Sequence, residues 1–452
     1  MNWKPSIFLG CVLLLFAGLA LLLFRYPRVT DHLSSHRTEE TRYSRSMEQA
    51  PDALPKRASP LDGTGREKVF QEQREKIRQL EAIGYVSGVN ESHSVAGVVV
   101  YDRSRTWDSL NIYISGHAPQ AVLMDMDGTV LHTWSYAYED ALGKAPPNRD
   151  ARSWRYAHMY PNGDLLAIYE GRALIKVTKD SDLQWVYADR CHHQVDVTDN
   201  GLIYVLSREP KIIGEIHKTE PISDDLISVL DESGTVVNRL SILECFRNSK
   251  YYSSIYRTIA QKLKADLLTE KHAPGDVLHT NALRVLDGGN SEQSQIFRKG
   301  NVLLSMRELN MLAIVNMEKS TVEWVAWGMW VTQHDPVLLA NGRMLVFDNR
   351  GYRGKSRVIE FDPFTQQVFW EYKGDPPKSF FSRVCGANQR LANGNTLITD
   401  TDNGRALEVT RGGTVVWEYM SPHRTGDHDE LVARLFNLSR IPKEWKLPWL
   451  ER

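Results

Sequence analysis

A repeat of 46 to 51 residues is the feature that most constrains the fold of this 452-residue chain. Each unit closes on an apolar strand that usually ends in Trp, at Trp134, Trp185, Leu240, Trp324, Trp370 and Trp417. The spacing is 51 residues from Trp134 to Trp185, 46 from Trp324 to Trp370 and 47 from Trp370 to Trp417. A period of this length, about four strands per unit, is typical of a β-propeller. We therefore predict an all-β fold with a six-bladed propeller over residues 94–440.

Turn signals within the units agree with this prediction. Asn-Gly pairs separate apolar runs at 162–163, 200–201, 341–342 and 393–394. Such a pair predicts a type I′ hairpin, because both central residues of that turn need positive φ. The strand-like segment 96–101 lies upstream of the first full unit, and we predict that it completes the last blade and closes the ring. Residues 241–276 predict one or two helices inserted over one end of the ring.

The N-terminal segment predicts a membrane anchor in residues 1–28. Residues 7–24 are 18 uncharged, mostly apolar positions, just long enough for a membrane span. A signal peptide is the alternative, but Arg25-Tyr26-Pro27-Arg28 stands where a small-residue cleavage site is expected. We expect an uncleaved, single-pass anchor. The flanking charges leave its orientation open, because long domains translocate despite a charge bias.

Three further segments complete the predicted organisation. Residues 29–65 are polar and predict a flexible tether. Residues 66–93 predict a helix and a connector, and the apolar stripe Phe70, Ile77 and Leu80 lets the helix pack on the domain or on a second copy in a homodimer. Residues 441–452 form a C-terminal tail.

Charge and cysteine content exclude some classes of function. The 55 basic and 56 acidic residues give a net charge of −1, so no global field favours nucleic acid. Cys11 lies in the apolar segment, which leaves Cys191, Cys245 and Cys385. Their odd number excludes a complete disulfide framework and leaves one bridge open.

Three histidines share one register of the repeat. His193 and His334 each stand seven residues before an Asn-Gly turn, and His279 stands eight before Asp287-Gly288. Equivalent positions of successive propeller blades face the same end of the central channel, so we expect these histidines to converge there. In the same alignment the first unit offers Arg155 and His158.

Two kinds of site fit this arrangement. Three imidazoles can hold a metal ion, or histidine and arginine can bind and transfer a phosphoryl or sulfuryl group. Arg307 ends the strand that follows His279, and its planar fork matches an oxyanion, whereas a metal gains nothing from a neighbouring guanidinium. Histidine is also a competent covalent nucleophile. We therefore predict a site without metal or other cofactor.

Five ordered motifs resemble the bacterial aryl-sulfate sulfotransferases, including their arylsulfotransferase-like branch, over about residues 96–440. They read HHQVDVTDNGLIYVLSRE, DVLHTNALRVLD, NVLLSMRELNMLAIVNMEKSTVEWVAWG, QHDPVLLANGRMLVFDN and RLANGNTLITDTDNGRALEVTRGGTVVWEY. The resemblance implies a six-bladed propeller outside the cytoplasm. It also implies transfer of a sulfuryl group from a phenolic sulfate ester to a phenolic acceptor, without a nucleotide donor.

The resemblance also assigns roles to residues. His334 in QHDP is the implied nucleophile, which becomes transiently sulfated. His279 in LHTN, His193 in HHQ and Arg307 in SMRE are implied to hold the sulfate oxygens and to stabilise the leaving phenoxide. Three residues of the same motifs are predicted to bind substrate, namely His192, Asn281 and Asp335.

The chain differs from the family at three points. The predicted membrane tether replaces a cleaved signal peptide. HHQ stands where the family commonly has HHD, which removes a carboxylate beside His193. No cysteine lies between Cys245 and Cys385, whereas better-known members carry a disulfide close to the nucleophile. The alternative function is therefore a non-catalytic propeller that binds an anionic or aromatic ligand or a partner protein.

Overall fold

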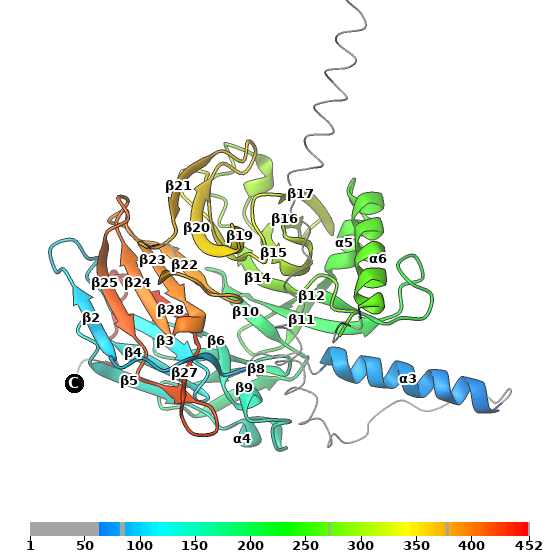
Figure 1. The fold of residues 1–452 in the computed structure, drawn as a ribbon, viewed down its shortest axis with the longest axis horizontal. Coiled ribbons are helices and arrows are strands. Elements are labelled where there is room, and N and C mark those ends of the chain that lie inside the picture. Colours follow the sequence, from blue (N-terminus) through cyan, green and yellow to red (C-terminus); the bar gives the residue numbers. More distant parts are fainter. Residues whose placement is uncertain (1–62, 82–85, 270, 272, 377–378, 451–452) are drawn as a thin grey trace, which may run out of the picture. The chain divides into compact units, whose positions relative to one another are not determined.

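The computed structural model describes residues 63–81, 86–269, 271, 273–376 and 379–450. The predicted membrane anchor and nearly all of the predicted tether lie outside these ranges. No helix within them is long and apolar enough to cross a membrane. The described fold is all-β, as predicted, and consists of several antiparallel sheets (Figure 1).

Six sheets of four or more strands occur within the described residues. The first contains β28 (Leu435–Arg440), β3 (Asn111–Ser115), β4 (Gln120–Met124) and β5 (Val130–Ser135). The second contains β6 (Trp154–Met159), β7 (Leu165–Tyr169), β8 (Ala173–Val177) and β9 (Leu183–Tyr187). The third contains β10 (His192–Val197), β11 (Ile203–Lys211), β12 (Ile222–Leu230) and β13 (Val236–Ser241).

The other three sheets follow in chain order. The fourth contains β14 (Thr280–Val285), β15 (Val302–Met306), β16 (Met311–Asn316) and β17 (Thr321–Trp327). The fifth contains β18 (His334–Leu338), β19 (Met344–Tyr352), β20 (Lys355–Phe361) and β21 (Val368–Tyr372). The sixth contains β22 (Ala387–Arg390), β23 (Thr396–Asp400), β24 (Arg405–Val409), β25 (Val415–Met420) and β2 (Gly97–Tyr101).

The first strands of the sheets contact one another in cyclic order. β6, β10, β14, β18, β22 and β28 each contact the next strand of this series, and β28 contacts β6 in turn. The arrangement is propeller-like (Figure 1).

The closing residues of the sequence repeat lie in the fourth strand of each sheet, as the repeat predicts. Their tryptophans join neighbouring sheets. The Trp134 indole N–H donates to the Gly163 carbonyl at 2.8 Å, from the first sheet to the second, and Trp417 donates to the Met126 carbonyl at 2.9 Å, from the sixth to the first. Because a buried indole N–H needs a partner, this hydrogen bond explains why Trp recurs at that position.

The strand β2 joins the last sheet, as predicted, but it does not close the ring. It pairs with β25 as the outermost strand of the sixth sheet, which already has four strands of its own. The first sheet instead takes its innermost strand from the C-terminal end of the chain, where β28 pairs with β3.

The turn at Asn341-Gly342 also differs from the prediction. Only Gly342 has positive φ, at 78°, and the Leu339 N–H donates to the Arg343 carbonyl at 2.8 Å. The loop is therefore longer than a two-residue type I′ turn, with glycine in the single left-handed position.

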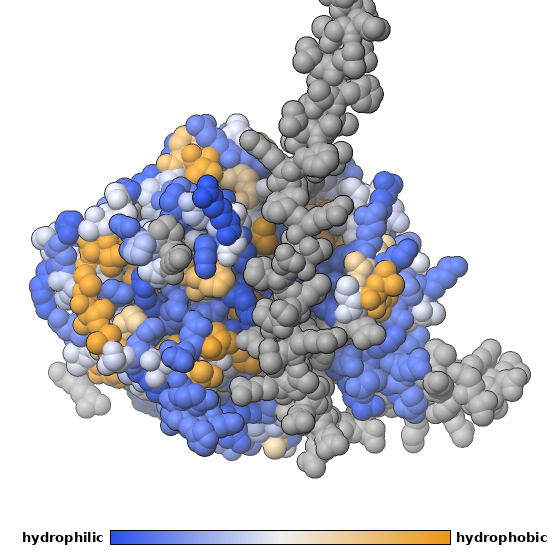
Figure 2. Space-filling view, in the orientation of Figure 1, coloured by the Kyte–Doolittle hydropathy of each residue, from blue (hydrophilic) through white to orange (hydrophobic). Residues whose placement is uncertain are grey.

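Helices lie outside the sheets. They are α3 (Gly63–Glu81), α4 (Tyr138–Leu142), α5 (Ile242–Arg247) and α6 (Tyr252–Leu268), with short 3₁₀ turns η2 (Asp150–Arg152), η3 (Gln295–Phe297), η4 (Arg307–Leu309) and η6 (Thr401–Asn403). α5 and α6 form the insertion before the fourth sheet. A small sheet joins β1 (Gly88–Glu91), β27 (Leu431–Ala433) and β26 (Arg424–Thr425). Figure 2 shows a mainly hydrophilic face with small, separate hydrophobic groups.

Candidate active site

The first strands of three neighbouring sheets begin with an irregular backbone. The register shifts between His192 and Val195, between Thr280 and Ala282, and between His334 and Val337. His193 and His279 lie in the left-handed region, at φ 59° and 48°. Such strain costs about 1–3 kcal/mol per residue and collects at functional sites, where bulges redirect side chains.

His334 is buried and held in one tautomer. Its Nδ1 lies 2.8 Å from the Asn349 Oδ1 and 3.0 Å from the Thr332 carbonyl. Both of these oxygens accept, so we assign the proton to Nδ1 and a lone pair to Nε2. The Cys385 backbone N–H donates to Nε2 at 3.2 Å. The atom that would attack an electrophile is therefore the unprotonated nitrogen.

His279 has a carboxylate partner of its own. Its Nδ1 donates to Asp276, three residues earlier. The His279 ring and this hydrogen bond hold the pKa of Asp276 at about 2, although burial acts in the opposite direction. The pair leaves Nε2 of His279 unprotonated, so this nitrogen can accept a proton.

Arg307 begins η4, directly after β15, and is tied to His279 through the backbone. Its N–H donates to the His279 carbonyl at 3.1 Å, and its guanidinium lies 2.8 Å from a Glu308 carboxylate oxygen. Burial and the charge of Arg307 lower the pKa of His279. A planar guanidinium fork matches the oxygens of an oxyanion.

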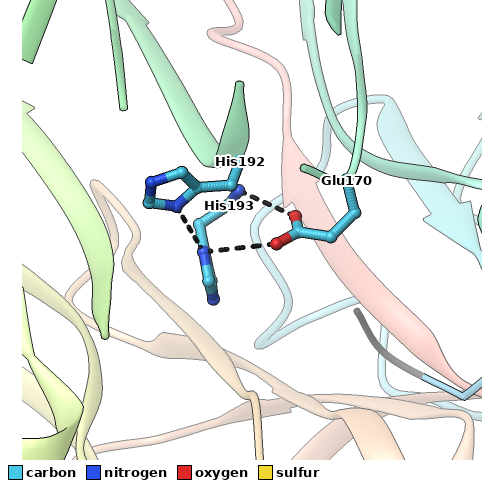
Figure 3. Close-up of side chains that lie close together, drawn as sticks. All are labelled: Glu170, His192 and His193. Carbon is cyan, nitrogen blue, oxygen red and sulfur yellow. Dashed lines mark hydrogen bonds and ion pairs between the residues drawn. The ribbon is translucent and has the colours of Figure 1, made fainter. Parts of the chain in front are cut away.

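His193 is supported by a residue from the neighbouring sheet. Its backbone N–H donates to a Glu170 oxygen at 2.9 Å, and its Nδ1 lies 2.8 Å from Nδ1 of His192 (Figure 3). The rings of His193 and His279 meet edge to face, with centroids 5.0 Å apart. Glu170 thus places a carboxylate beside His193, where the HHQ motif lacks one.

Burial lowers the pKa of His192, His193, His279 and His334. For His334 the guanidinium charges of Arg307 and Arg155 add to this effect, whereas the Asn349 hydrogen bond opposes it. All four imidazoles are therefore neutral near pH 7, which leaves the positive charge of the site to its arginines.

Acid should destabilise the folded protein through these imidazoles. Above the ordinary histidine pKa of 6.5 they are neutral in both states. Below it the unfolded chain binds protons that the folded site does not, so stability falls by about 1 kcal/mol per imidazole and pH unit. We expect the melting temperature to drop between pH 7.5 and 5.5. His334→Gln should make this drop shallower, and an unchanged slope in that variant would contradict the assignment.

Not every predicted residue reaches the group of imidazoles. The Asn281 amide donates to the Gln333 carbonyl at 2.9 Å. Asp335 accepts from Arg284 at 2.8 Å and from the Asn388 N–H at 2.8 Å. These two residues thus hold the inner strands together, and His192 stands behind His193.

The sequence offered Arg155 without indicating its role, and sequence reasoning passed over three other residues of the site. Arg155 places its guanidinium 3.5 Å from Cys385 Sγ and 4.9 Å from the Phe436 ring centroid. It stands seven residues before Asn162, the register of His193 and His334, so the repeat held the signal. No position in the repeat points to the other three residues, which are Glu170, Asp276 and Asn349.

The residues that the structure brings close enough to bind a metal ion differ from the three histidines that the sequence suggested. In the described part of the chain, ligand atoms of Glu170, His192 and His193 all lie within 4.8 Å of one another, whereas the three histidines of one register do not form such a group. The positive charges of Arg208 and Arg155 already compensate the negative charge of the Glu170 carboxylate, which weakens its attraction for a divalent cation.

The described cysteines are buried and free, so the open bridge among Cys191, Cys245 and Cys385 does not form.

Fold and site together define an all-β, propeller-like protein with a buried site of neutral imidazoles and guanidinium groups, a set suited to an anionic group. A model of the arylsulfotransferase (ASST) family matches residues 163–422. The chain therefore belongs to the arylsulfotransferase family, which supports a sulfotransferase activity in general terms. No curated protein matches the sequence.

Solved structures resemble the chain distantly. A Bacteroides caccae protein of unknown function has a TM-score of 0.48 at 11% identity, covering 74% of this chain and 98% of its own. A streptogramin B lyase has a TM-score of 0.41 at 11% identity, covering 78% and 97%. The WD40 β-propeller domain of Doa1 has a TM-score of 0.38 at 12% identity, covering 75% and 87%. Similarities at these scores carry no further conclusion.

Proposed function

We propose that this protein is an aryl-sulfate sulfotransferase that moves a sulfuryl group from a phenolic sulfate ester to a phenolic acceptor through sulfo-His334. The observation that carries the proposal is the fixed tautomer of His334, whose Nδ1 donates to Asn349 and leaves Nε2 unprotonated. An unprotonated, buried imidazole beside guanidinium groups fits nucleophilic attack on an anionic sulfur centre. Family membership supports the same reaction class.

The first half-reaction forms one bond and breaks one. The Nε2 lone pair of His334 attacks sulfur, the bond between sulfur and the phenolic oxygen breaks, and the oxygen leaves with the electron pair. Arg307 faces the charge that develops on oxygen. The Nδ1 proton stays on the sulfated ring and continues to donate to Asn349.

The second half-reaction reverses these changes with another phenol. The acceptor loses its proton to an unprotonated imidazole of the site, either His279, which Asp276 positions, or His193. Its oxygen attacks sulfur, the bond between sulfur and Nε2 breaks, and the electron pair returns to His334. The cycle needs no nucleotide donor.

The architecture and location are part of the proposal. Six described sheets and their cyclic strand contacts support a closed, six-bladed propeller. The apolar stretch 7–24 supports a single-pass anchor with the catalytic domain in the periplasm.

A non-catalytic binding propeller is the second candidate, and one observation favours it. The Cys385 N–H donates to Nε2 of His334, so the lone pair that would attack sulfur is occupied in this structure. Catalysis requires the sulfate ester to displace this amide.

Intact-mass measurement separates the two candidates. The purified protein, incubated with p-nitrophenyl sulfate and no phenolic acceptor, should gain the mass of one SO₃ group and release nitrophenol once per molecule. Later addition of a phenol should remove the added mass. Reversible binding of the ester without added mass would support the binding propeller and end the covalent mechanism.

A further inference from the structure

A line of three buried side chains leads away from the candidate site. His193 Nδ1 lies 2.8 Å from His192 Nδ1, an interaction drawn as a dashed line in Figure 3. His192 Nε2 lies 3.7 Å from an Asp225 carboxylate oxygen. His192 and Asp225 are almost fully buried. The imidazole of His192 thus stands between the site and a carboxyl group that the proposed reaction does not use.

The Ser207 carbonyl determines which nitrogens of His192 and His193 carry protons before the reaction. His192 Nε2 lies 3.2 Å from the Ser207 carbonyl, which can only accept, so Nε2 carries a proton. Nδ1 of His192 is then an acceptor, and His193 donates to it from its own Nδ1. His193 therefore rests with an unprotonated Nε2, as His279 and His334 do. A proton for a leaving phenoxide has to come from elsewhere.

Asp225 is placed to hold that proton. One of its oxygens accepts from the Thr280 N–H at 2.7 Å, and Asp276 and Arg208 are the charged groups that act on it. Burial and the negative charge of Asp276 raise the pKa of Asp225 to about 7. Asp276 stays ionised, so the site keeps two carboxyl groups in different protonation states, as acid and base pairs in enzymes do.

We infer that Asp225 is the proton carrier of the site: it supplies the proton of the departing phenol through His192 and His193, and recovers it from the acceptor phenol. The inference rests on the proposed sulfuryl transfer. Asp225 acts through His192 and His193 and does not itself meet the substrate.

The proton can move from Asp225 to the phenoxide while the His192 and His193 rings both begin and end neutral. In the donating arrangement the Asp225 O–H faces Nε2 of His192, the His192 N–H faces Nδ1 of His193, and His193 carries its proton on Nε2. That proton passes to the phenoxide oxygen, His192 passes its Nδ1 proton to His193, and Asp225 passes its proton to His192. Both rings end neutral and Asp225 ends ionised. The acceptor's proton returns along the same path and restores the Asp225 acid.

Asp225→Asn tests the carrier with a series of aryl sulfates whose phenols differ in acidity. p-Nitrophenyl sulfate needs little help from an acid, so its first half-reaction should change by less than about threefold. Esters of weakly acidic phenols should slow by about 10²-fold or more, because general acid catalysis contributes that much. The rate should therefore depend more steeply on the phenol pKa than it does in the unsubstituted protein. Equal losses for all esters, or no loss, would overturn the inference.

Asp224→Asn is the matched control. Asp224 is the preceding residue of β12, is equally buried, and pairs with Lys211 at 3.0 Å. Its substitution removes a buried carboxylate without touching the line to His193, so the dependence on phenol pKa should stay that of the unsubstituted protein. A steeper dependence in this variant as well would show a structural effect and overturn the inference. Turnover of p-nitrophenyl sulfate by the unsubstituted protein tests the proposed function separately.

Infrared spectroscopy gives a readout that needs no substrate. Burial raises the pKa of both Asp225 and Asp400 to about 7, so the C=O stretches of two buried carboxylic acids should appear as the pH is lowered through that value. Asp225→Asn should remove one of these components and Asp400→Asn the other, whereas Asp224→Asn should keep both. A signal near neutral pH that Asp225→Asn leaves unchanged would overturn the inference whatever the protein's activity.

Discussion

His334→Ala is expected to abolish sulfuryl transfer and the SO₃ adduct while leaving the fold intact. In the proposed mechanism this side chain supplies the attacking atom, so its loss should lower the transfer rate by at least about 10³-fold. Rapid mixing with p-nitrophenyl sulfate should show no burst of nitrophenol. The variant removes an imidazole that is neutral when folded, so no charge is left without a partner and the melting temperature near pH 7.5 should fall only modestly.

His132→Ala is the control for this result. His132 lies on the outer strand β5, contacts the Lys179 carbonyl at 2.7 Å and packs edge to face on Trp134. It should keep the adduct and the burst. Undiminished turnover by His334→Ala would rule out sulfo-His334 as the intermediate. A reaction that survived through another imidazole would show its adduct at a different residue after proteolysis and mass analysis.

Arg307→Ala should produce the second-largest loss, about 10²- to 10³-fold in the rate of sulfuryl transfer. In the proposed reaction the Arg307 guanidinium is the charge that faces the oxygens of the transferred group and of the leaving phenol. The fold should tolerate the change, because Glu308 keeps the ammonium groups of Lys262 and Lys271 at 2.7 and 3.0 Å. Stopped-flow release of nitrophenol measures the effect on the first half-reaction.

Two further variants define the cause of that loss. Arg307→Lys keeps the charge without the planar fork, so it should recover part of the rate. Arg298→Ala removes a guanidinium that interacts with Glu323, close to the outer strand of the same sheet, and should leave transfer unchanged. Equal rates for Arg307→Ala and the unsubstituted protein would exclude Arg307 from the reaction.

The repeat could be read from the sequence because the closing tryptophan has a constant role. Trp134 and Trp417 each bond the turn of the next sheet, so the same residue type recurs at a constant interval. The origin of the innermost strand of the first sheet could not be read in this way. β28 pairs with β3, more than 300 residues earlier, and no local pattern fixes a partner at that separation.

Site residues that occupy the same position in successive repeats could be predicted from the sequence, and the others could not. His193, His279 and His334 follow from one register, and Arg155 obeys it too. Asp276 pairs with His279 next to a left-handed backbone at residue 279, a geometry that residue spacing does not reveal. Asp224 and Asp225 are adjacent on β12, and a strand pattern places them on opposite faces without saying which one meets the imidazoles.

The position of β28 has a consequence for how the protein is made. Leu435–Arg440 follows every other strand of the six sheets along the chain, so β3 keeps one edge unpaired until all of them have been synthesised. A premature stop immediately before residue 435 removes the innermost strand of the first sheet, although every other strand of the six sheets is made. We expect such truncated chains to aggregate during synthesis instead of persisting as shortened proteins.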